Sequence, residues 1–190
     1  RIVSYARLQV AEDGNLSVNN HAKIIAININ ILSNQKAGLD FDLPDFPSQV
    51  LLSSTVRFNS TIYFFGGLAL KSGAKIDNYE VGSKPEISSD NFSADARLVT
   101  LDLSTYKWEK VAHLKNQDVL AKLVVLGEDI YSFGGFRQDE SGTFEFSQKV
   151  KKFDFEILEW KDTNTSLELK ITDMNEWVDS YRLIKVSETY

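Results

Sequence analysis

The chain of 190 residues contains no cysteine. This absence excludes disulfides, thiolate nucleophiles, zinc sites built on cysteine and iron–sulfur centres. It favours a reducing compartment such as the cytoplasm, although disulfide-free secreted domains exist. Histidine is scarce too: with only His21 and His113, a metal site would need carboxylates for most of its ligands. We therefore expect no metal and no cofactor.

Long apolar runs and basic clusters are also missing. No apolar run approaches the roughly 20 residues of a bilayer-spanning helix, so we expect no membrane span. Lys and Arg number 21 against 27 Asp and Glu, and no basic stripe for a phosphate backbone is present. Nucleic acid is therefore not an expected partner. The chain starts at Arg1 without a cleavable leader, which indicates a segment of a longer protein.

Short strand-like runs, bounded by Gly, Asn, Asp, Ser and Pro, fill most of the sequence. Residues 6–10 and 16–18 flank a turn with Gly14, which predicts a hairpin. Residues 24–32 and 39–43 alternate apolar with polar side chains, as strands with one buried face do. These four strands are enough for one small antiparallel sheet.

Helical periodicity is almost absent. Residues 166–177 could hold a turn or two of helix, but the alternation in residues 167–171 favours a strand, and we expect another strand at residues 177–186. The sequence therefore predicts an all-β protein.

Two parts of the chain repeat. Residues 56–67 align without a gap to residues 124–135, each reading as strand, turn, strand and glycine pair. Residues 101–108 align to residues 153–160, and in both an Asp precedes a Trp by six positions. Because the order is the same in both copies, the segments form an internal repeat.

The pattern hydrophobic-Ile-Tyr-x-Phe-Gly-Gly, followed by Asp and Trp, resembles the kelch repeat. The resemblance implies that each repeat forms one four-stranded blade of a β-propeller. It is clear for residues 47–114 and 115–164, degenerate for residues 1–46, and leaves a partial blade in residues 165–190. We therefore expect residues 1–190 to be a single partial kelch-like β-propeller of about three to four four-stranded antiparallel blades.

Propellers commonly hold four to eight blades, so an open stack of this size would expose apolar blade faces. The first expectation is that the remainder of the propeller comes from the same longer chain. Alternatively, residues 1–10 complete the last blade of a small closed ring, or another chain or copy closes it.

The marks of the repeat have an architectural explanation. Near the axis of a propeller the inner strands crowd, and glycine pairs allow backbones to approach where a Cβ would clash. Near the rim a Trp fills the wider space between sheets. No helix follows either glycine pair, which excludes a phosphate-binding loop. The predicted structural residues are Gly66, Gly67, Trp108, Gly134, Gly135 and Trp160.

Candidate binding residues lie in two loops expected on one propeller face. The loop in residues 68–95 is 16 residues longer than its counterpart in the next repeat, which includes residues 136–144. Mixed charge with exposed aromatic side chains is typical of a protein-contact surface. The alternative is a mobile, solvated insertion without a partner. The predicted partner-binding residues are Tyr79, Glu80, Phe92, Phe136, Arg137, Asp139 and Phe144.

We expect no catalytic residues. Galactose-oxidase-like propellers need a Tyr cross-linked to Cys, and sialidase propellers need an arginine cluster and a Ser-x-Asp-x-Gly-x-Thr-Trp turn, none of which this sequence has. The predicted function is therefore a non-catalytic protein-interaction or scaffold module of kelch type. The alternative is a propeller-fold carbohydrate-binding protein or glycan-acting enzyme, because aromatic side chains stack on sugars.

Four Asn-x-Ser/Thr triplets are candidate N-glycosylation sites and leave a secretory-pathway origin open. They begin at Asn15, Asn59, Asn91 and Asn164.

Overall fold

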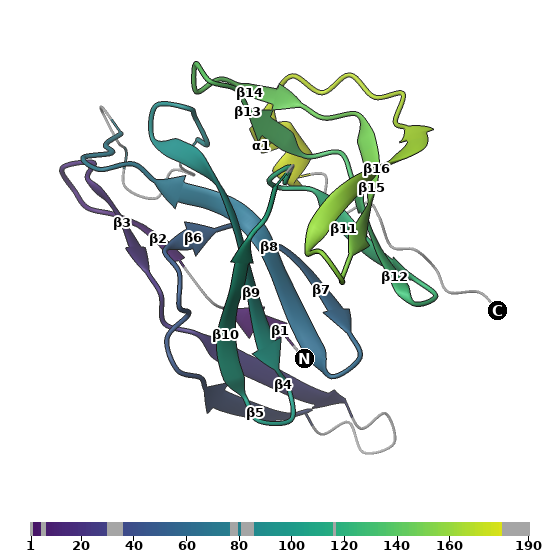
Figure 1. The fold of residues 1–190 in the computed structure, drawn as a ribbon. Helices are drawn as coiled ribbons and strands as arrows, with labels where there is room; N and C mark the ends of the chain where they lie inside the picture. The colour runs from purple at the N-terminus through teal and green to yellow at the C-terminus, as the bar shows by residue number, and fades with distance from the viewer. Residues whose placement is uncertain are drawn as a thin grey trace.

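The computed structural model describes residues 2–4, 7–29, 36–76, 80, 86–115 and 117–179. Antiparallel strands make up nearly all of its regular structure, which confirms the all-β prediction (Figure 1). Residues 180–190, where part of a strand was predicted, lie outside the described residues.

The first repeat forms a five-stranded antiparallel sheet and the second a four-stranded one. The β7–β10 sheet contains β7 (Ser54–Phe58), β8 (Thr61–Leu70), β9 (Phe92–Asp102) and β10 (Lys107–His113), and short β6 (Val50–Leu51) pairs with the far end of β8. The β11–β16 sheet contains β11 (Lys122–Leu126), β12 (Asp129–Phe133), β15 (Lys149–Asp154) and β16 (Glu159–Ser166). A separate ribbon of β13 (Phe136–Gln138) and β14 (Phe144–Phe146) lies between β12 and β15 in the chain.

The two sheets share unusual backbone conformations at equivalent positions. A positive φ is uncommon for residues other than glycine, so its recurrence marks a common chain path. One matched pair, Leu52 and Leu120, lies outside the segments that align in sequence. The pairs are Leu52 (54°) and Leu120 (60°), Asn59 (55°) and Gly127 (64°), Gly66 (54°) and Gly134 (62°), and Tyr106 (57°) and Leu158 (53°).

The repeated Asp closes the turn that precedes each Trp. Asp102 Oδ1 accepts a hydrogen bond from the Ser104 N–H at 2.7 Å, and Asp154 Oδ1 accepts one from the Glu156 N–H at 2.9 Å. Hydrogen bonding to the charged carboxylate lowers the pKa of both aspartates, with Lys161 contributing most at Asp154. The six-residue spacing therefore spans this turn, from the last residue of one strand to the second residue of the next.

The N-terminal strands form two sheets instead of the predicted one. β1 (Ile2–Ser4), β4 (Lys23–Ile29) and β5 (Lys36–Asp42) form a three-stranded sheet, whereas β2 (Arg7–Val10) and β3 (Leu16–Asn19) form the predicted hairpin by themselves. The hairpin binds the chain that follows β8: the Leu16 N–H donates to Ala74 O at 3.1 Å, and the Ile76 N–H donates to Gly14 O at 3.0 Å. This long-range pairing separates the hairpin from β4.

The strands predicted after residue 166 are wrong where the structure describes the chain. Residues 167–173 have no regular secondary structure, and the chain then forms the helix α1 (Met174–Asp179). Asp173 favours the helix start because its Oδ1 accepts the Asn175 N–H at 2.7 Å. Met174 and Trp177, three residues apart, point to one side and are buried.

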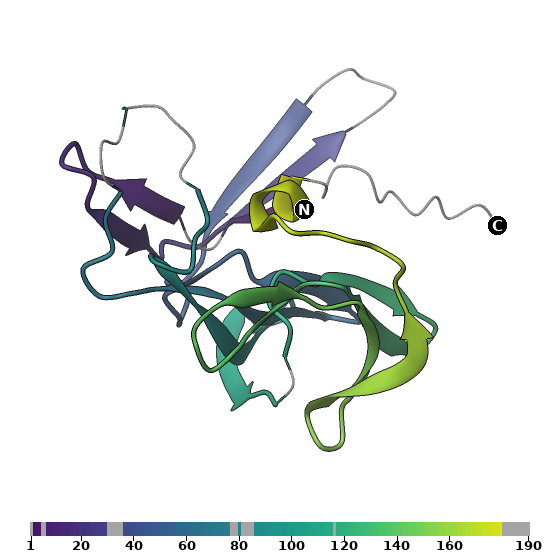
Figure 2. The same ribbon diagram turned by 90° about the horizontal axis from the view of Figure 1, so that it is seen from above.

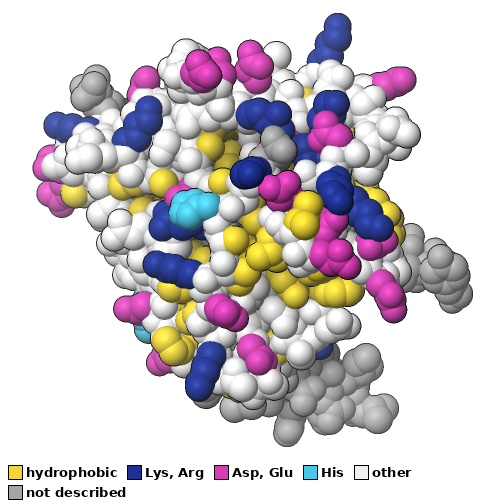
Figure 3. Space-filling model, viewed as in Figure 1, with side chains coloured by type: hydrophobic (Ala, Val, Ile, Leu, Met, Phe, Trp, Pro, Cys, Tyr) yellow, Lys and Arg dark blue, Asp and Glu magenta, His cyan; other side chains and the backbone are white. Residues whose placement is uncertain are grey.

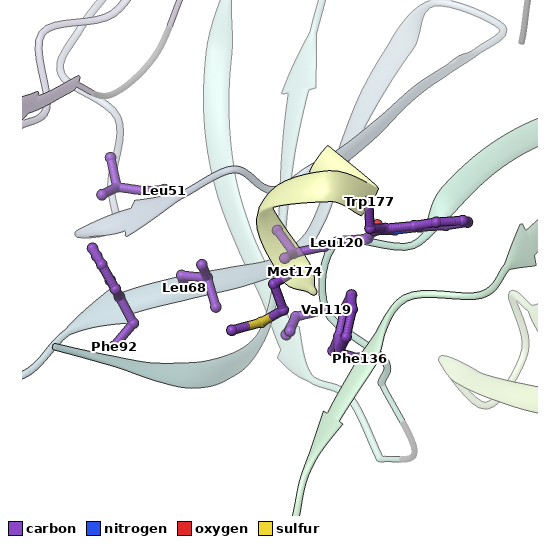
Figure 4. Packing of buried hydrophobic residues seen from close by; sticks show 8 residues of the cluster. All are labelled: Leu51, Leu68, Phe92, Val119, Leu120, Phe136, Met174 and Trp177. Atoms are coloured by element: carbon purple, nitrogen blue, oxygen red, sulfur yellow. The ribbon is translucent and has the colours of Figure 1, made fainter. Parts of the chain in front are cut away.

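Two apolar clusters hold the repeats together. One fills the space between the β7–β10 and β11–β16 sheets and contains Phe65, Leu98, Leu114, Ile130, Phe153 and Trp160. The other lies beside the glycine pairs, where Met174 and Trp177 of α1 belong to one cluster with Leu51, Leu68, Phe92, Val119, Leu120 and Phe136 (Figure 4). From above, the chain is seen to return from β16 to this position (Figure 2).

Candidate interaction surface

The second glycine of each pair lies where two chain segments touch. A Cβ on Gly67 would be 2.5 Å from Leu51 O, and a Cβ on Gly135 would be 2.6 Å from Val119 O. Such contacts are too short for any side chain, and both residues have positive φ. Gly67 therefore lets β8 lie against residues 50–53, and Gly135 lets the chain entering β13 lie against residues 119–121.

The tryptophans have matching surroundings. The Trp160 ring lies 5.0 Å from Phe65 and 5.1 Å from Phe153, and its Nε1–H donates to Gln117 Oε1 at 2.6 Å. The Trp108 ring contacts Phe46 and Phe64, and its Nε1–H donates to Pro44 O at 2.8 Å. Each ring contacts a residue that precedes its own sheet, although Trp160 is buried and Trp108 only half-buried.

We use the name loop face for the side that carries the loop between β8 and β9, the β13–β14 ribbon and α1 (Figure 1). Hydrogen bonds join these parts. The Ala94 N–H near the start of β9 donates to Gln138 Oε1 of the ribbon at 2.9 Å, and the Ile87 N–H of the loop donates to Asn175 Oδ1 of α1 at 3.0 Å. The described part of the long loop is thus fastened to its neighbours.

Two of the predicted partner-binding residues are not exposed. Phe92 and Phe136 are each 2% exposed and belong to the cluster under α1, so the prediction that they face a partner is wrong. The reason is that β9 and β13 begin at these residues, and alternation within a strand turns their rings inward. Glu80 and Asp139 are exposed, Phe144 is half-buried, and Tyr79 lies outside the described residues.

Arg137 is the predicted residue with the most elaborate support. Its Nη2 lies 2.9 Å and its Nε 3.1 Å from Asp118 Oδ1, while 52% of its side chain stays exposed. Asp118 is buried and also pairs with the buried Lys151. Burial lowers the pKa of Lys151, and Asp118 opposes that shift. The buried pair holds Arg137 in one orientation at the surface.

Asp118 and Lys151 were missed by the sequence reasoning, although the repeat contains the signal. At the spacing of the repeat, Asp118, Arg137 and Lys151 correspond to Val50, Ala69 and Val99. The second repeat therefore carries three charged residues where the first has apolar ones. Burying charges is costly unless they are paired, so this difference between the repeats marks where a buried ion pair lies in the second one.

An open pocket of about 480 Å³ lies between β14 and residues 169–172. Phe144 and Phe146 supply aromatic surface, and the Gln148 Nε2–H donates to Leu169 O at 3.0 Å across it. Glu145, Lys170 and Thr172 add polar groups. The pocket therefore combines aromatic and polar lining.

Lys122 lies beside this region and fastens α1. Its Nζ donates to Trp177 O at 3.1 Å and lies 4.7 Å from the centre of the Trp177 ring. Burial lowers the pKa of Lys122 to about 8. The Trp177 Nε1–H donates to Leu120 O at 2.8 Å. Trp177 is therefore hydrogen-bonded through both its backbone carbonyl and its indole N–H.

A second open pocket of about 480 Å³ is lined by residues of β12, β15 and β16. Four of its charged side chains pair with one another: Lys152 Nζ lies 2.8 Å from Asp129, and Lys161 Nζ lies 2.5 Å from Asp154. Among the described residues no group of three or more His, Asp or Glu gathers in a way that could hold a metal. His113 is exposed, and His21 lies 3.6 Å from both Asp42 and Asp45 at the surface.

The candidate glycosylation sites differ in exposure. Asn15, Asn59 and Asn164 are exposed. Asn91 is half-buried, and its Oδ1 accepts the Lys75 N–H at 3.1 Å. A glycan on Asn91 would therefore have to displace a contact of the loop face.

Comparison with known proteins gives the fold and no more. No protein-family model matches the chain, and no curated protein is similar to it. Among solved structures, 109 chains match, including one of a protein called YjhT with a TM-score of 0.52 and 11% sequence identity. The likeness covers 86% of this chain and 52% of that one, so this chain spans about half its length. In the part that the structure describes, no helix is long and apolar enough to cross a membrane.

Proposed function

We propose that the chain is a segment of a kelch-type β-propeller, with the β7–β10 and β11–β16 sheets as two of its blades, and that it acts as a non-catalytic protein-interaction module. The recurring backbone conformations and the matching surroundings of Trp108 and Trp160 support the assignment of blades. The partner binds at the loop face, around Arg137.

The orientation of Arg137 carries this proposal. A half-exposed guanidinium held by a buried carboxylate loses little side-chain entropy when a partner binds, which favours affinity. Exposed Asp139 and Glu145 lie on the same ribbon, so the surface offers charges of both signs around a rigid centre. Figure 3 shows charged side chains of both signs over this part of the molecule. Such a surface suits a protein partner.

Charge reversal tests the proposal. Glu145→Lys changes the ribbon, and Glu128→Lys makes the same change in the exposed turn between β11 and β12 as a control. Quantitative affinity purification from the native cells should recover a partner with the unchanged protein and with the control, but not with Glu145→Lys or Arg137→Glu. Calorimetry with the purified partner should give the same order. Equal recovery by all four proteins would contradict binding at the loop face.

The pocket beside Phe144 and Phe146 favours carbohydrate binding as a second candidate. Its size suits a small ligand, and its aromatic and polar lining matches the needs of a sugar ring. A glycan array should then give a signal that Phe144→Ala removes and Glu128→Lys keeps. An array without signal would eliminate this candidate.

A further inference from the structure

The pocket beside β14 shares its apolar side with the cluster that contains Trp177 of α1. The residues that line the pocket and also belong to this cluster, or pack against it, are Phe136, Phe144, Phe146 and Ile171. The Phe146 ring lies 5.0 Å from the Trp177 ring and 5.5 Å from the Phe136 ring. The pocket and α1 therefore depend on the same aromatic side chains.

The other wall of the pocket is part of the segment that leads into α1. Residues 169–172 line it, lie between β16 and α1 in the chain, and have no regular secondary structure (Figure 2). Within the described part of the chain, no strand pairs with them. At one end the Gln148 Nε2–H donates to Leu169 O at 3.0 Å, and at the other end α1 begins at Met174. The position of this wall therefore depends on the docking of α1.

Polar contacts fasten α1 to both repeats. Trp177 is hydrogen-bonded to Leu120 and Lys122 of the second repeat. Asn175 holds the long loop of the first: its Oδ1 accepts the Ile87 N–H at 3.0 Å, and its Nδ2–H donates to Ile87 O at 3.4 Å. Because a helix of six residues is not stable by itself, α1 stays helical only while these contacts hold it.

We infer that residues 169–179 form a strap that docks and lifts as one unit, and that its docking completes the pocket beside Phe144 and Phe146. None of these residues belongs to a strand, so both sheets keep their strand pairing when the strap lifts. Local opening of such a segment costs less free energy than global unfolding. A small ligand that contacts both walls would enter while the strap is lifted and would be held when it docks. The inference goes beyond the proposed functions, because the strap controls access for whichever class of ligand the pocket takes.

Hydrogen exchange of the indole N–H groups, followed by NMR, tests whether the strap lifts without the sheets. The Trp177 Nε1–H is bonded to Leu120 O, whereas the Trp160 Nε1–H is bonded to Gln117 Oε1 beside the packing between the sheets. The Trp177 group should exchange severalfold faster than the Trp160 group, and its rate should depend less on low concentrations of urea. Exchange of Trp177 no faster than that of Trp160, with the same urea dependence, would overturn the inference.

Two glycines provide a matched pair of variants. A Cβ on Gly134 would lie 3.0 Å from two ring carbons of Trp177, so Gly134→Ala pushes against the strap without removing any of its side chains. Gly127 has a φ of 64°, close to the 62° of Gly134, but an added Cβ there has open space around it. Gly134→Ala should raise the ratio of the Trp177 to the Trp160 exchange rate severalfold, whereas Gly127→Ala should leave this ratio unchanged.

A second pair of variants lies in α1 itself and covers the case in which Gly134→Ala does not fold. Asn175→Ala removes the contact with Ile87, whereas Glu176→Ala changes the next, exposed position. Asn175→Ala should raise the same exchange ratio severalfold and Glu176→Ala should not. A ratio that Asn175→Ala leaves unchanged would contradict the fastening of the strap by this residue and with it the inference.

Hydroxyl-radical footprinting tests whether the docked strap completes the pocket. Trp177→Ala removes the anchor of the strap, so oxidation of Phe144 should rise severalfold, while that of Phe58 in the cluster between the sheets should stay the same. Phe144 is measured instead of Phe146 because the Phe146 ring contacts Trp177 and would be uncovered by the truncation alone. Unchanged oxidation of Phe144 would overturn the inference.

Discussion

Truncating Trp160 should be the most damaging single change in the packing between the two sheets. The ring is 3% exposed, contacts Phe65 and Phe153, and donates a hydrogen bond to Gln117. Replacing a buried Trp with Ala loses the transfer free energy of the ring and leaves a cavity, together about 3–5 kcal/mol. Trp160→Phe keeps most of the ring volume and loses the hydrogen bond, at a cost of about 1–2 kcal/mol.

Denaturant unfolding followed by far-UV circular dichroism measures these losses without depending on tryptophan fluorescence. Trp108→Ala should cost less than Trp160→Ala because Trp108 is only half-buried. Ile157→Ala is the control, since this side chain is 53% exposed and its loss should stay within about 0.5 kcal/mol. A loss below about 1 kcal/mol for Trp160→Ala, or a larger loss for Trp108→Ala, would refute the reasoning.

Three further predictions concern stability in denaturant unfolding. Gly135→Ala should cost at least about 2 kcal/mol because its Cβ would meet the backbone at positive φ. Gly127→Ala, which also has positive φ but open space around it, should cost about 1 kcal/mol. Equal costs would contradict the close approach of the backbone at Gly135. Asp118→Ala should cost about 3–5 kcal/mol because it removes the carboxylate that pairs with the buried Lys151. Asp118→Val with Lys151→Val, the residues of the first repeat, should recover most of this loss. Between about pH 8 and pH 10 the unfolded chain holds the Lys122 proton more tightly than the folded protein. The free energy of unfolding, measured relative to Lys122→Met, should therefore rise by up to about 1.4 kcal/mol per pH unit in this range. A pH-independent difference between the two proteins would argue against the lowered pKa of Lys122.

The fold elements that local chemistry determines could be predicted from the sequence. The aligned segments at residues 56–67 and 124–135 became equivalent strand pairs, and the turn at Gly14 joined a hairpin. The separate position of that hairpin could not be predicted, because it depends on contacts with Ala74 and Ile76 far along the chain. The helix after Asp173 is likewise stabilised by long-range burial of Trp177.

The candidate site was harder to predict than the fold. Phe92 and Phe136 were placed on loops because nothing local shows how far β9 and β13 extend. The support of Arg137 by Asp118 and Lys151 joins positions 19 and 14 residues away in the chain, which only the folded sheet brings together. A comparison of the two repeats position by position was the one signal available for it.

A double-mutant cycle between Phe65 and Trp160 tests the central claim, that the second repeat stacks its Trp on the sheet of the first. The rings lie 5.0 Å apart and come from different sheets. Aromatic pairs of this kind contribute about 0.5–1.5 kcal/mol beyond the two single losses, and we predict a coupling energy in that range. The Phe65–Trp108 cycle is the control, because Trp108 contacts Phe46 and Phe64 instead. Additive losses for Phe65 and Trp160 would contradict the stacking of the two repeats.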